Sequence, residues 1–253
     1  MKTLKLLSMA ILPLVLAGCE SNSGSSSSTG KVTDICGNTY KTVKIGSQVW
    51  MAENLKCNKY DTESEMSGST IPVVTGRSKS PGYIDATDKS NWTMIDERSE
   101  NLSSDQISKL GYLYNWAAVV GEPDSYEQKS EYSGHRQGIC PNGWHVPSAK
   151  EFSVLVDAMG GNGSAGKAMK TKSGWFGNGN GTDSKGFSGL PAGYCLDDNV
   201  SYVGVQAYFW TSSVFSSSPE SYSDIRYLGI YDDECSTFGD YKKYCSSVRC
   251  VKN

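Results

Sequence analysis

Apolar and polar residues alternate near the start of the chain in a way that predicts a β-hairpin. The alternation covers residues 39–45 and 48–51 and is interrupted at Gly46. Glycine at the first position of a two-residue loop adopts the positive φ that a tight hairpin turn requires. In such a hairpin the numbers of facing residues add to 93, which places Val43 opposite Trp50 as a cross-strand pair.

Two later segments repeat their apolar residues at the helical period. In residues 104–120 apolar side chains recur every three to four positions, although Gly111 weakens the pattern. Residues 148–159 form a stronger prediction, because Ser148 and Glu151 match a capping box and a pair of glycines follows the segment. We therefore expect two helices.

The rest of the chain predicts short strands and long loops. Residues 58–101 are polar and irregular, residues 162–190 are rich in turn-forming residues, and short apolar runs follow at 189–195, 207–211, 225–231 and 247–252. A hairpin, then helices, then several short strands is the order of an α+β fold with short antiparallel strands, and it does not match the regular alternation of an α/β fold.

The first residues predict a bacterial lipoprotein signal. Lys2 and Lys5 precede an apolar run over residues 6–17, which is too short to span a bilayer as a helix. Small residues lie directly before Cys19, the position at which a lipoprotein signal peptidase cuts and the thiol carries diacylglycerol. An ordinary secretory signal with an incidental cysteine is the alternative.

This prediction divides the chain into a signal peptide (1–18), a lipidated serine-rich tether (19–30) and a folded domain (31–253). The protein is then held by its lipid in the bacterial cell envelope, at the outer membrane or cell surface. The whole chain has a formal charge of −3, and without the two lysines of the signal the charge is −5. A mildly acidic chain argues against a nucleic-acid partner.

Seven cysteines remain after Cys19, so one thiol stays unpaired or pairs between molecules. The numbers of Cys36 and Cys57 also add to 93, so the hairpin register would bring them face to face within disulfide range. Cys245 and Cys250 lie five residues apart in an extended segment and point to opposite faces, so they are not expected to bond to each other.

Few residues suggest metal or catalytic chemistry. The two histidines, His135 and His145, could join acidic residues in a zinc site, but a packed His145 with one satisfied ring nitrogen is the preferred interpretation. The acidic clusters at 197–199 and 232–234 would favour calcium if they bound a metal, yet neither has EF-hand spacing, and solvated charges are preferred. The G-x-G-x-x-G at 161–166 follows a helix instead of a strand and is expected to be a loop. We predict no catalytic residue and no required cofactor.

Three aromatic residues in loop-like segments are candidates for ligand binding: Trp92, Trp175 and Phe176. Exposed rings can stack on the apolar C–H face of a sugar. The competing interpretation is that these rings fill the core beneath long loops.

Several phrases of the sequence, in this order, resemble the Fibrobacter succinogenes major paralogous domain. They are NTYKTVKIGSQVWMAENL (38–55), GYLYNWAA (111–118), GICPNGWHVPS (138–148), GFSGLPAGY (186–194), YFWTSS (208–213) and SVRCVKN (247–253). Members of that family are typically exported lipoproteins without an established activity. The closing phrase is also similar to the C-type-lectin-like and sulfatase-modifying-factor fold group, which implies a single lectin-like domain.

The lectin-like resemblance implies a disulfide between Cys140, just before the capped helix, and Cys250 on the last strand. Cys235 with Cys245 is then the preferred remaining pair, which would leave Cys195 free. The spacing of Cys245 and Cys250 also resembles the copper-binding cysteine pair of formylglycine-generating enzymes, but Cys250 matches the structural cysteine of the family. The lectin tripeptide E-P-N is only approximated at residues 122–124, which argues against calcium-dependent sugar binding.

These observations predict a lipid-anchored envelope module for binding or adhesion, with a polysaccharide as the expected ligand. The alternative is a structural or interaction protein of the envelope that binds another envelope protein and no small ligand. An enzyme of the formylglycine-generating type is the third and least favoured hypothesis.

Overall fold

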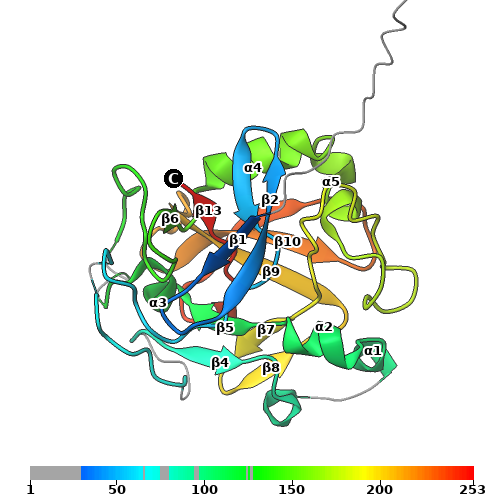
Figure 1. Cartoon of the computed structure of the whole chain (residues 1–253), viewed down its shortest axis with the longest axis horizontal. Helices are drawn as coiled ribbons and strands as arrows, with labels where there is room; N and C mark the ends of the chain where they lie inside the picture. Colours follow the sequence, from blue (N-terminus) through cyan, green and yellow to red (C-terminus); the bar gives the residue numbers. More distant parts are fainter. Residues whose placement is uncertain (1–29, 65, 75–79, 94–96, 124, 126–127) are drawn as a thin grey trace, which may run out of the picture.

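The computed structural model describes residues 30–253 except 65, 75–79, 94–96, 124 and 126–127. Three mostly antiparallel sheets form the framework, with strand orders β1-β2-β3-β13-β6, β11-β10-β9 and β4-β5-β12-β7-β8 (Figure 1). Helices are few, so the fold is a mixed α+β arrangement dominated by antiparallel sheets.

The strands are β1 (Gly30–Thr33), β2 (Thr39–Ile45), β3 (Gln48–Met51), β4 (Tyr83–Asp85), β5 (Tyr112–Asn115), β6 (Trp144–His145), β7 (Tyr194–Leu196), β8 (Asn199–Ser201), β9 (Gln206–Val214), β10 (Tyr222–Gly229), β11 (Ser236–Tyr241), β12 (Cys245–Ser246) and β13 (Val251–Lys252). The helices are α1 (Glu97–Glu100), α2 (Ser104–Ser108), α3 (Trp116–Val120), α4 (Ala149–Ala158), α5 (Asn162–Met169) and the 3₁₀ turn η1 (Lys89–Asn91).

The predicted hairpin is present with the predicted register. Strands β2 and β3 pair antiparallel, and Val43 faces Trp50. Gly46 has a φ of 60° at the turn, as a two-residue loop requires. Trp50 is fully buried and packs on Phe152 of α4 with ring centroids 4.9 Å apart, which joins the hairpin to the core.

The prediction of one continuous helix over residues 104–120 is wrong. The segment divides into α2, strand β5 and helix α3. Gly111 ends the first helical turns with a φ of 75°, and a Cβ there would lie 2.7 Å from the carbonyl oxygen of Leu55. Asn115 then caps α3 by accepting a hydrogen bond from the backbone N–H of Ala118.

The second predicted helix is present as α4. Its Ser148 and Glu151 form the complete capping box. The segment expected to be a loop at 161–166 instead leads into helix α5. Helix α5, helix α1 and the division of residues 104–120 into α2 and α3 together give more helices in the described residues than the two predicted. Gly166 lies so close to Glu234 that an added Cβ would be 1.9 Å from the Glu234 carbonyl oxygen.

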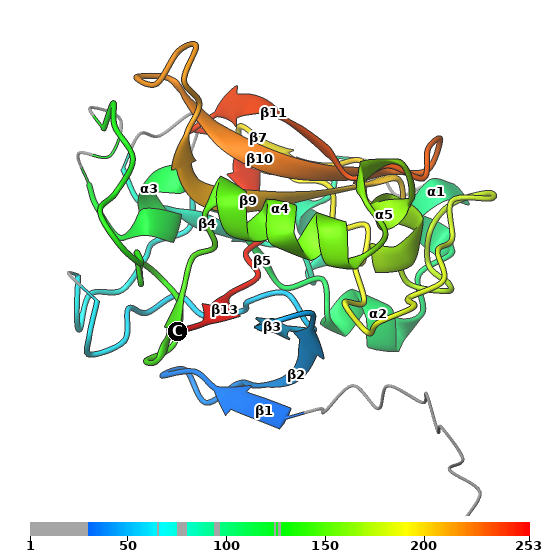
Figure 2. The same cartoon turned by 90° about the horizontal axis from the view of Figure 1, so that it is seen from above.

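The short strands of the C-terminal half are only partly where the apolar runs place them. Strands β9 and β10 cover most of the expected 207–211 and 225–231 runs. The 189–195 and 247–252 runs are mainly irregular, and their regular strand residues belong to the short strands β7 and β13. Strands β9–β11 lie on the opposite side of the molecule from β1 and β2, and α4 packs along β9 and β10 (Figure 2).

A buried lysine holds one of the long loops against the core. The ammonium group of Lys242 donates hydrogen bonds to the carbonyl oxygens of Ser125, Gln128 and Pro219 at 2.6–3.1 Å. It also lies 4.4 Å from the centre of the Trp116 ring, a cation–π contact. Three backbone acceptors that would otherwise be buried without donors are satisfied in this way.

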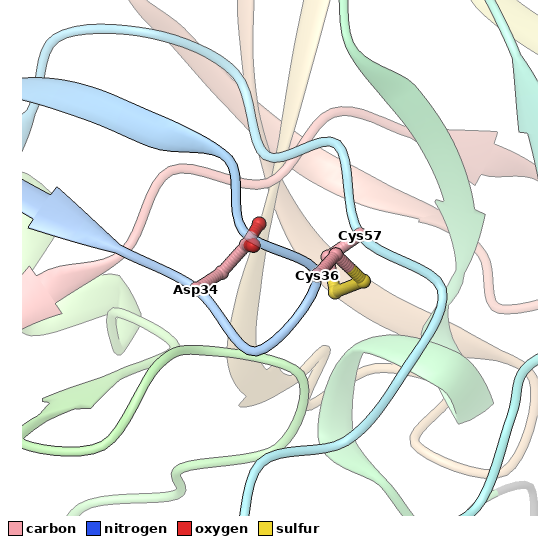
Figure 3. Close-up of side chains that lie close together, drawn as sticks. All are labelled: Asp34, Cys36 and Cys57. Carbon is pink, nitrogen blue, oxygen red and sulfur yellow. A yellow bond between two sulfur atoms is a disulfide. The ribbon is translucent and has the colours of Figure 1, made fainter.

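Two of the predicted disulfides are present. Cys36 bonds to Cys57 with a Cα–Cα separation of 5.6 Å, and Cys140 bonds to Cys250 with a separation of 5.9 Å. The β2–β3 ladder does not itself extend to the first pair, because Cys36 lies in the turn between β1 and β2 (Figure 3). The register therefore identifies the correct pair, although turns bring the two cysteines together.

The predicted pairing of Cys235 with Cys245 is wrong in this structure, where both thiols are free. Cys235 lies in the hydrophobic cluster beneath α4, whereas Cys245 lies in a separate cluster with Cys195. Cys195 was expected to be free, and it is free in this structure. It nevertheless faces Cys245 directly across the antiparallel pair β7–β12. Burial and a side-chain interaction with Cys195 raise the pKa of the Cys245 thiol.

Under oxidising conditions we expect a third disulfide between Cys195 and Cys245. Facing residues of antiparallel strands have Cα atoms about 4.5–5.5 Å apart, which falls within the range that a disulfide spans. Peptide mapping of the unreduced protein, refolded in a glutathione redox buffer, should yield a linked peptide containing both cysteines. Cys235 should be alkylated in the same sample, and recovery of Cys195 and Cys245 as alkylated thiols would contradict the expectation.

No helix in the described part of the chain is both long and apolar enough to cross a membrane. Cys19, the signal peptide and nearly all of the tether lie outside the described residues. The lipid anchor therefore stays a prediction from the sequence.

Candidate functional site

Six half-exposed aromatic side chains form one continuous surface, which we call the aromatic platform. They are Tyr194, Tyr202, Tyr208, Tyr227, Phe238 and Tyr244. Eight of the 15 tyrosines of the chain lie between residues 194 and 244, so the enrichment is visible in the sequence. The sequence does not show that these rings share a face, because each comes from a different strand or turn.

The strand register of the β9–β10–β11 sheet places the central rings together. Tyr208 on β9 faces Tyr227 on β10, and their ring centroids are 5.1 Å apart. Phe238 on the outer strand β11 contacts both rings, with centroids 6.2 Å from Tyr208 and 6.1 Å from Tyr227. Side chains alternate between the faces of a strand, so three neighbouring strands present one ring each on the same face.

Strand β7 and the turn before β12 extend the platform. The ring of Tyr194 lies 5.3 Å from Tyr208, stacks on Tyr202 at 5.7 Å and lies 6.1 Å from Tyr244. Tyr202 is 48% exposed, so it can be approached from solvent. Its φ of 61° is uncommon for a residue with a side chain. Aromatic rings at these separations stabilise each other and hold a fixed arrangement.

Polar groups accompany the rings. Tyr208 donates its hydroxyl hydrogen to the side-chain oxygen of Gln206 at 3.0 Å. Asp240 on β11 lies near the tyrosines, and its charge raises the pKa of Tyr194 and Tyr208, for both of which burial is the larger cause. Burial also raises the pKa of Asp240 to about 6, against a lowering by the backbone N–H of Tyr241. The platform thus has a carboxyl group that changes charge in the mildly acidic range.

The aromatic platform can bind a ligand that offers both an apolar face and hydroxyl groups. Rings can stack on apolar C–H groups, while Asp240, Gln206 and the tyrosine hydroxyls can exchange hydrogen bonds.

The candidate residues predicted from the sequence are not part of this platform. Trp92 and Trp175 are buried, with 6% and 1% of their surfaces exposed. Their indole N–H groups donate to the carbonyl oxygens of Ala86 and Gly189, so the two side chains are satisfied members of the core. Phe176 is half-buried and stands next to Trp175 without a partner on the platform. The core-filling interpretation is correct for both tryptophans, because Trp175 packs in the hydrophobic cluster of α4 and Trp92 packs in the cluster that contains Val200.

Two groups of side chains in the described residues have metal-ligating atoms close together. In the first, Asp34 lies beside the Cys36–Cys57 disulfide (Figure 3). The two cysteine sulfurs of this group are bonded to each other. The Asp34 carboxylate accepts hydrogen bonds from Tyr40 and Asn38. This group is therefore structural.

The second group joins both histidines, His135 and His145, to Glu151. His145 is packed as expected, with 2% of its surface exposed. Both of its ring nitrogens, and not only one, have partners, which are Asn253 and Glu151. Within the described residues, neither acidic cluster expected as a calcium candidate belongs to such a group. Two lysines contact the cluster at 232–234. Lys167 forms an ion pair with Asp233 at 3.2 Å, and Lys170 donates a hydrogen bond to the Asp232 carbonyl oxygen.

These features define a disulfide-bridged α+β protein with an exposed aromatic face. The model of the Fibrobacter succinogenes major domain family matches residues 43–252, and the chain belongs to this family. No curated protein and no solved structure matches the chain.

Proposed function

We propose that this protein is a binding module of the bacterial cell envelope, held by a lipid on Cys19, that binds polysaccharide on its aromatic platform. The observation that supports the proposal is the continuous face of six rings with Asp240 and Gln206 among them. A pyranose ring has an apolar C–H face and equatorial hydroxyl groups, so it complements both parts of this surface.

A C-type-lectin-like arrangement is part of the same proposal. Its support is the Cys140–Cys250 disulfide, which connects the segment before α4 to the segment leading into β13. That is the bridge implied by the lectin-like resemblance of the sequence. The mode of sugar binding differs from a calcium-dependent one, because it rests on stacking.

Replacing Tyr202 by alanine is expected to weaken polysaccharide binding about tenfold or more, because one exposed stacking surface and its contact with Tyr194 are lost. Pull-down on insoluble plant polymers and calorimetry with soluble glycans, with and without calcium, would measure the effect. Tyr112→Ala is the matched control, since this half-exposed tyrosine stacks on Tyr83 on β4, away from the platform. Its binding should equal that of the unaltered protein.

The carboxyl group of Asp240 supplies a second arm of the same experiment. Its pKa is raised to about 6, so the ionised carboxylate that accepts sugar hydroxyls forms as the pH rises from about 5 to about 7. Binding should strengthen over that range, and Asp240→Asn should remove the pH dependence. Equal binding by Tyr202→Ala and Tyr112→Ala, or capture of envelope proteins in place of any glycan, would overturn the proposal.

A further inference from the structure

The two histidines of the chain lie ring against ring beside one glutamate. The imidazoles of His135 and His145 are parallel, with centroids 3.8 Å apart and an angle of 8° between their planes. One oxygen of Glu151, Oε1, lies 2.7 Å from Nε2 of His145 and 3.9 Å from Nε2 of His135. These residues come from the loop before β6, from β6 itself and from the first turn of α4.

Glu151 is held in position by its other oxygen. Oε2 accepts hydrogen bonds from the backbone N–H and the hydroxyl of Ser148, each at 2.8 Å, as part of the capping box. This leaves Oε1 directed at the two histidines. The carboxyl group is therefore held in one orientation before any ion binds.

His145 is oriented from its far side. Its Nδ1 lies 2.6 Å from the side-chain oxygen of Asn253, which accepts the Nδ1 proton. In the metal-free protein Nε2 donates to Oε1 of Glu151, and a metal ion bound between these two atoms takes the place of that proton. A histidine that ligates a metal commonly donates its other N–H to an oxygen in this manner, which fixes the ring and makes the ligating nitrogen more basic.

His135 is the third proposed ligand, and its ring must rotate before all three ligands can contact one ion. Lone pairs of parallel stacked rings run parallel and do not meet at one ion, so the ring of His135 must turn. Its side chain is 56% exposed and follows Gly134, whose φ is 76°, so rotation meets little resistance. Two ligands of a tetrahedral ion at ~2.05 Å lie ~3.3 Å apart, so Glu151 and His145 need to separate by only ~0.6 Å.

The surroundings leave room for the ion and for water. An open pocket of about 450 Å³ is lined by the three residues together with Ser148, Lys150 and Ser212. The neighbouring cation Arg136 is directed elsewhere, to the carbonyl oxygen of Val120 and the carboxylate of Glu122. Lys150 lines the pocket but offers a flexible side chain that can remain in solvent.

We propose that His135, His145 and Glu151 bind a divalent transition-metal ion, with Zn²⁺ as the best fit. Two imidazole nitrogens and one carboxylate oxygen are the ligand types that zinc accepts, and water from the pocket takes the fourth position. The nitrogen ligands disfavour calcium and magnesium, which prefer oxygen. This site is separate from the aromatic platform, and its existence does not depend on the proposed function.

Calorimetric titration of the metal-free full chain with zinc chloride should give one ion per molecule. His135→Ala should weaken binding at least tenfold, and this variant keeps its fold because the side chain is largely exposed. Glu151→Gln should weaken binding similarly while retaining the capping box, since glutamine serves at that position of the motif. Lys150→Ala, in the same pocket but not a ligand, is the matched control and should bind as the unaltered protein does.

Cobalt substitution supplies a readout of geometry. Co²⁺ bound by His135, His145 and Glu151 should show the visible d–d absorption of a tetrahedral site, and His135→Ala should lose it. Absence of stoichiometric zinc binding would overturn the proposal. Equal affinity for zinc in His135→Ala and the unaltered protein would also overturn it, because the ion would then lie on the free cysteines or elsewhere.

Discussion

The double variant Cys140→Ala/Cys250→Ala is expected to lower the free energy of unfolding by about 4–5 kcal/mol. The bond closes a loop of 110 residues, and a long loop has more conformational freedom to lose in the unfolded chain. Both cysteines are fully buried, so loss of their sulfur contacts adds to the effect. Urea unfolding followed by tryptophan fluorescence would measure it.

The matched control for this prediction is the double variant Cys36→Ala/Cys57→Ala. Its bond spans only 21 residues, which corresponds to about 3 kcal/mol. The loss of free energy of unfolding should therefore be larger for the variant that lacks the bond closing the longer loop. An equal or smaller loss on removal of Cys140–Cys250 would mean that the α4 and β13 segments are held together without the bond.

Features that depend on neighbours in sequence were predicted well. The β2–β3 hairpin and its register follow from local alternation and from the positive φ of Gly46. Helix α4 follows from Ser148 and Glu151, which lie within one helical turn of each other. The same register arithmetic identified the Cys36–Cys57 pair, because it needed only the separation of two residues from one turn.

Features that depend on distant contacts were not predicted. Gly111 divides an apparently helical segment because it packs against the backbone of Leu55, which no local pattern reveals. Trp92 and Trp175 resemble exposed loop aromatics in sequence, but both are buried by residues that lie far from them in the chain. His135 and His145 are ten residues apart, and only the pairing of Arg136 with Val146 brings their rings together.

A second large effect is expected at Arg249, a fully buried arginine just before β13. Its Nε donates to the side-chain oxygen of Asn54 at 2.6 Å, and its terminal nitrogens donate to the carbonyl oxygens of Met51, Phe187 and Ser188 at 2.5–3.2 Å. One guanidinium group thus satisfies three buried acceptors and one partly buried acceptor, which lie in two separate segments of the chain.

The surroundings of Arg249 show how the charge is accommodated. The guanidinium lies 4.7 Å from the ring of Phe187 and 5.6 Å from that of Phe209, so it contacts two aromatic rings. Burial lowers the pKa of the guanidinium to about 9, against the attraction of Glu53 and Asp183. The group therefore remains charged at neutral pH, and its stabilisation comes from hydrogen bonds in fixed directions.

We expect Arg249→Met to lower the free energy of unfolding by about 4 kcal/mol or more, because three buried oxygens and one partly buried oxygen lose their donors. Arg249→Lys should cost about 2–3 kcal/mol, since an ammonium keeps the charge but lacks the planar set of donors. Lys252→Met, on the exposed side of β13, is the control and should change stability by less than about 0.5 kcal/mol. Chemical denaturation of the three variants would test this order, and an Arg249→Met protein as stable as the control would show that the buried acceptors find other donors.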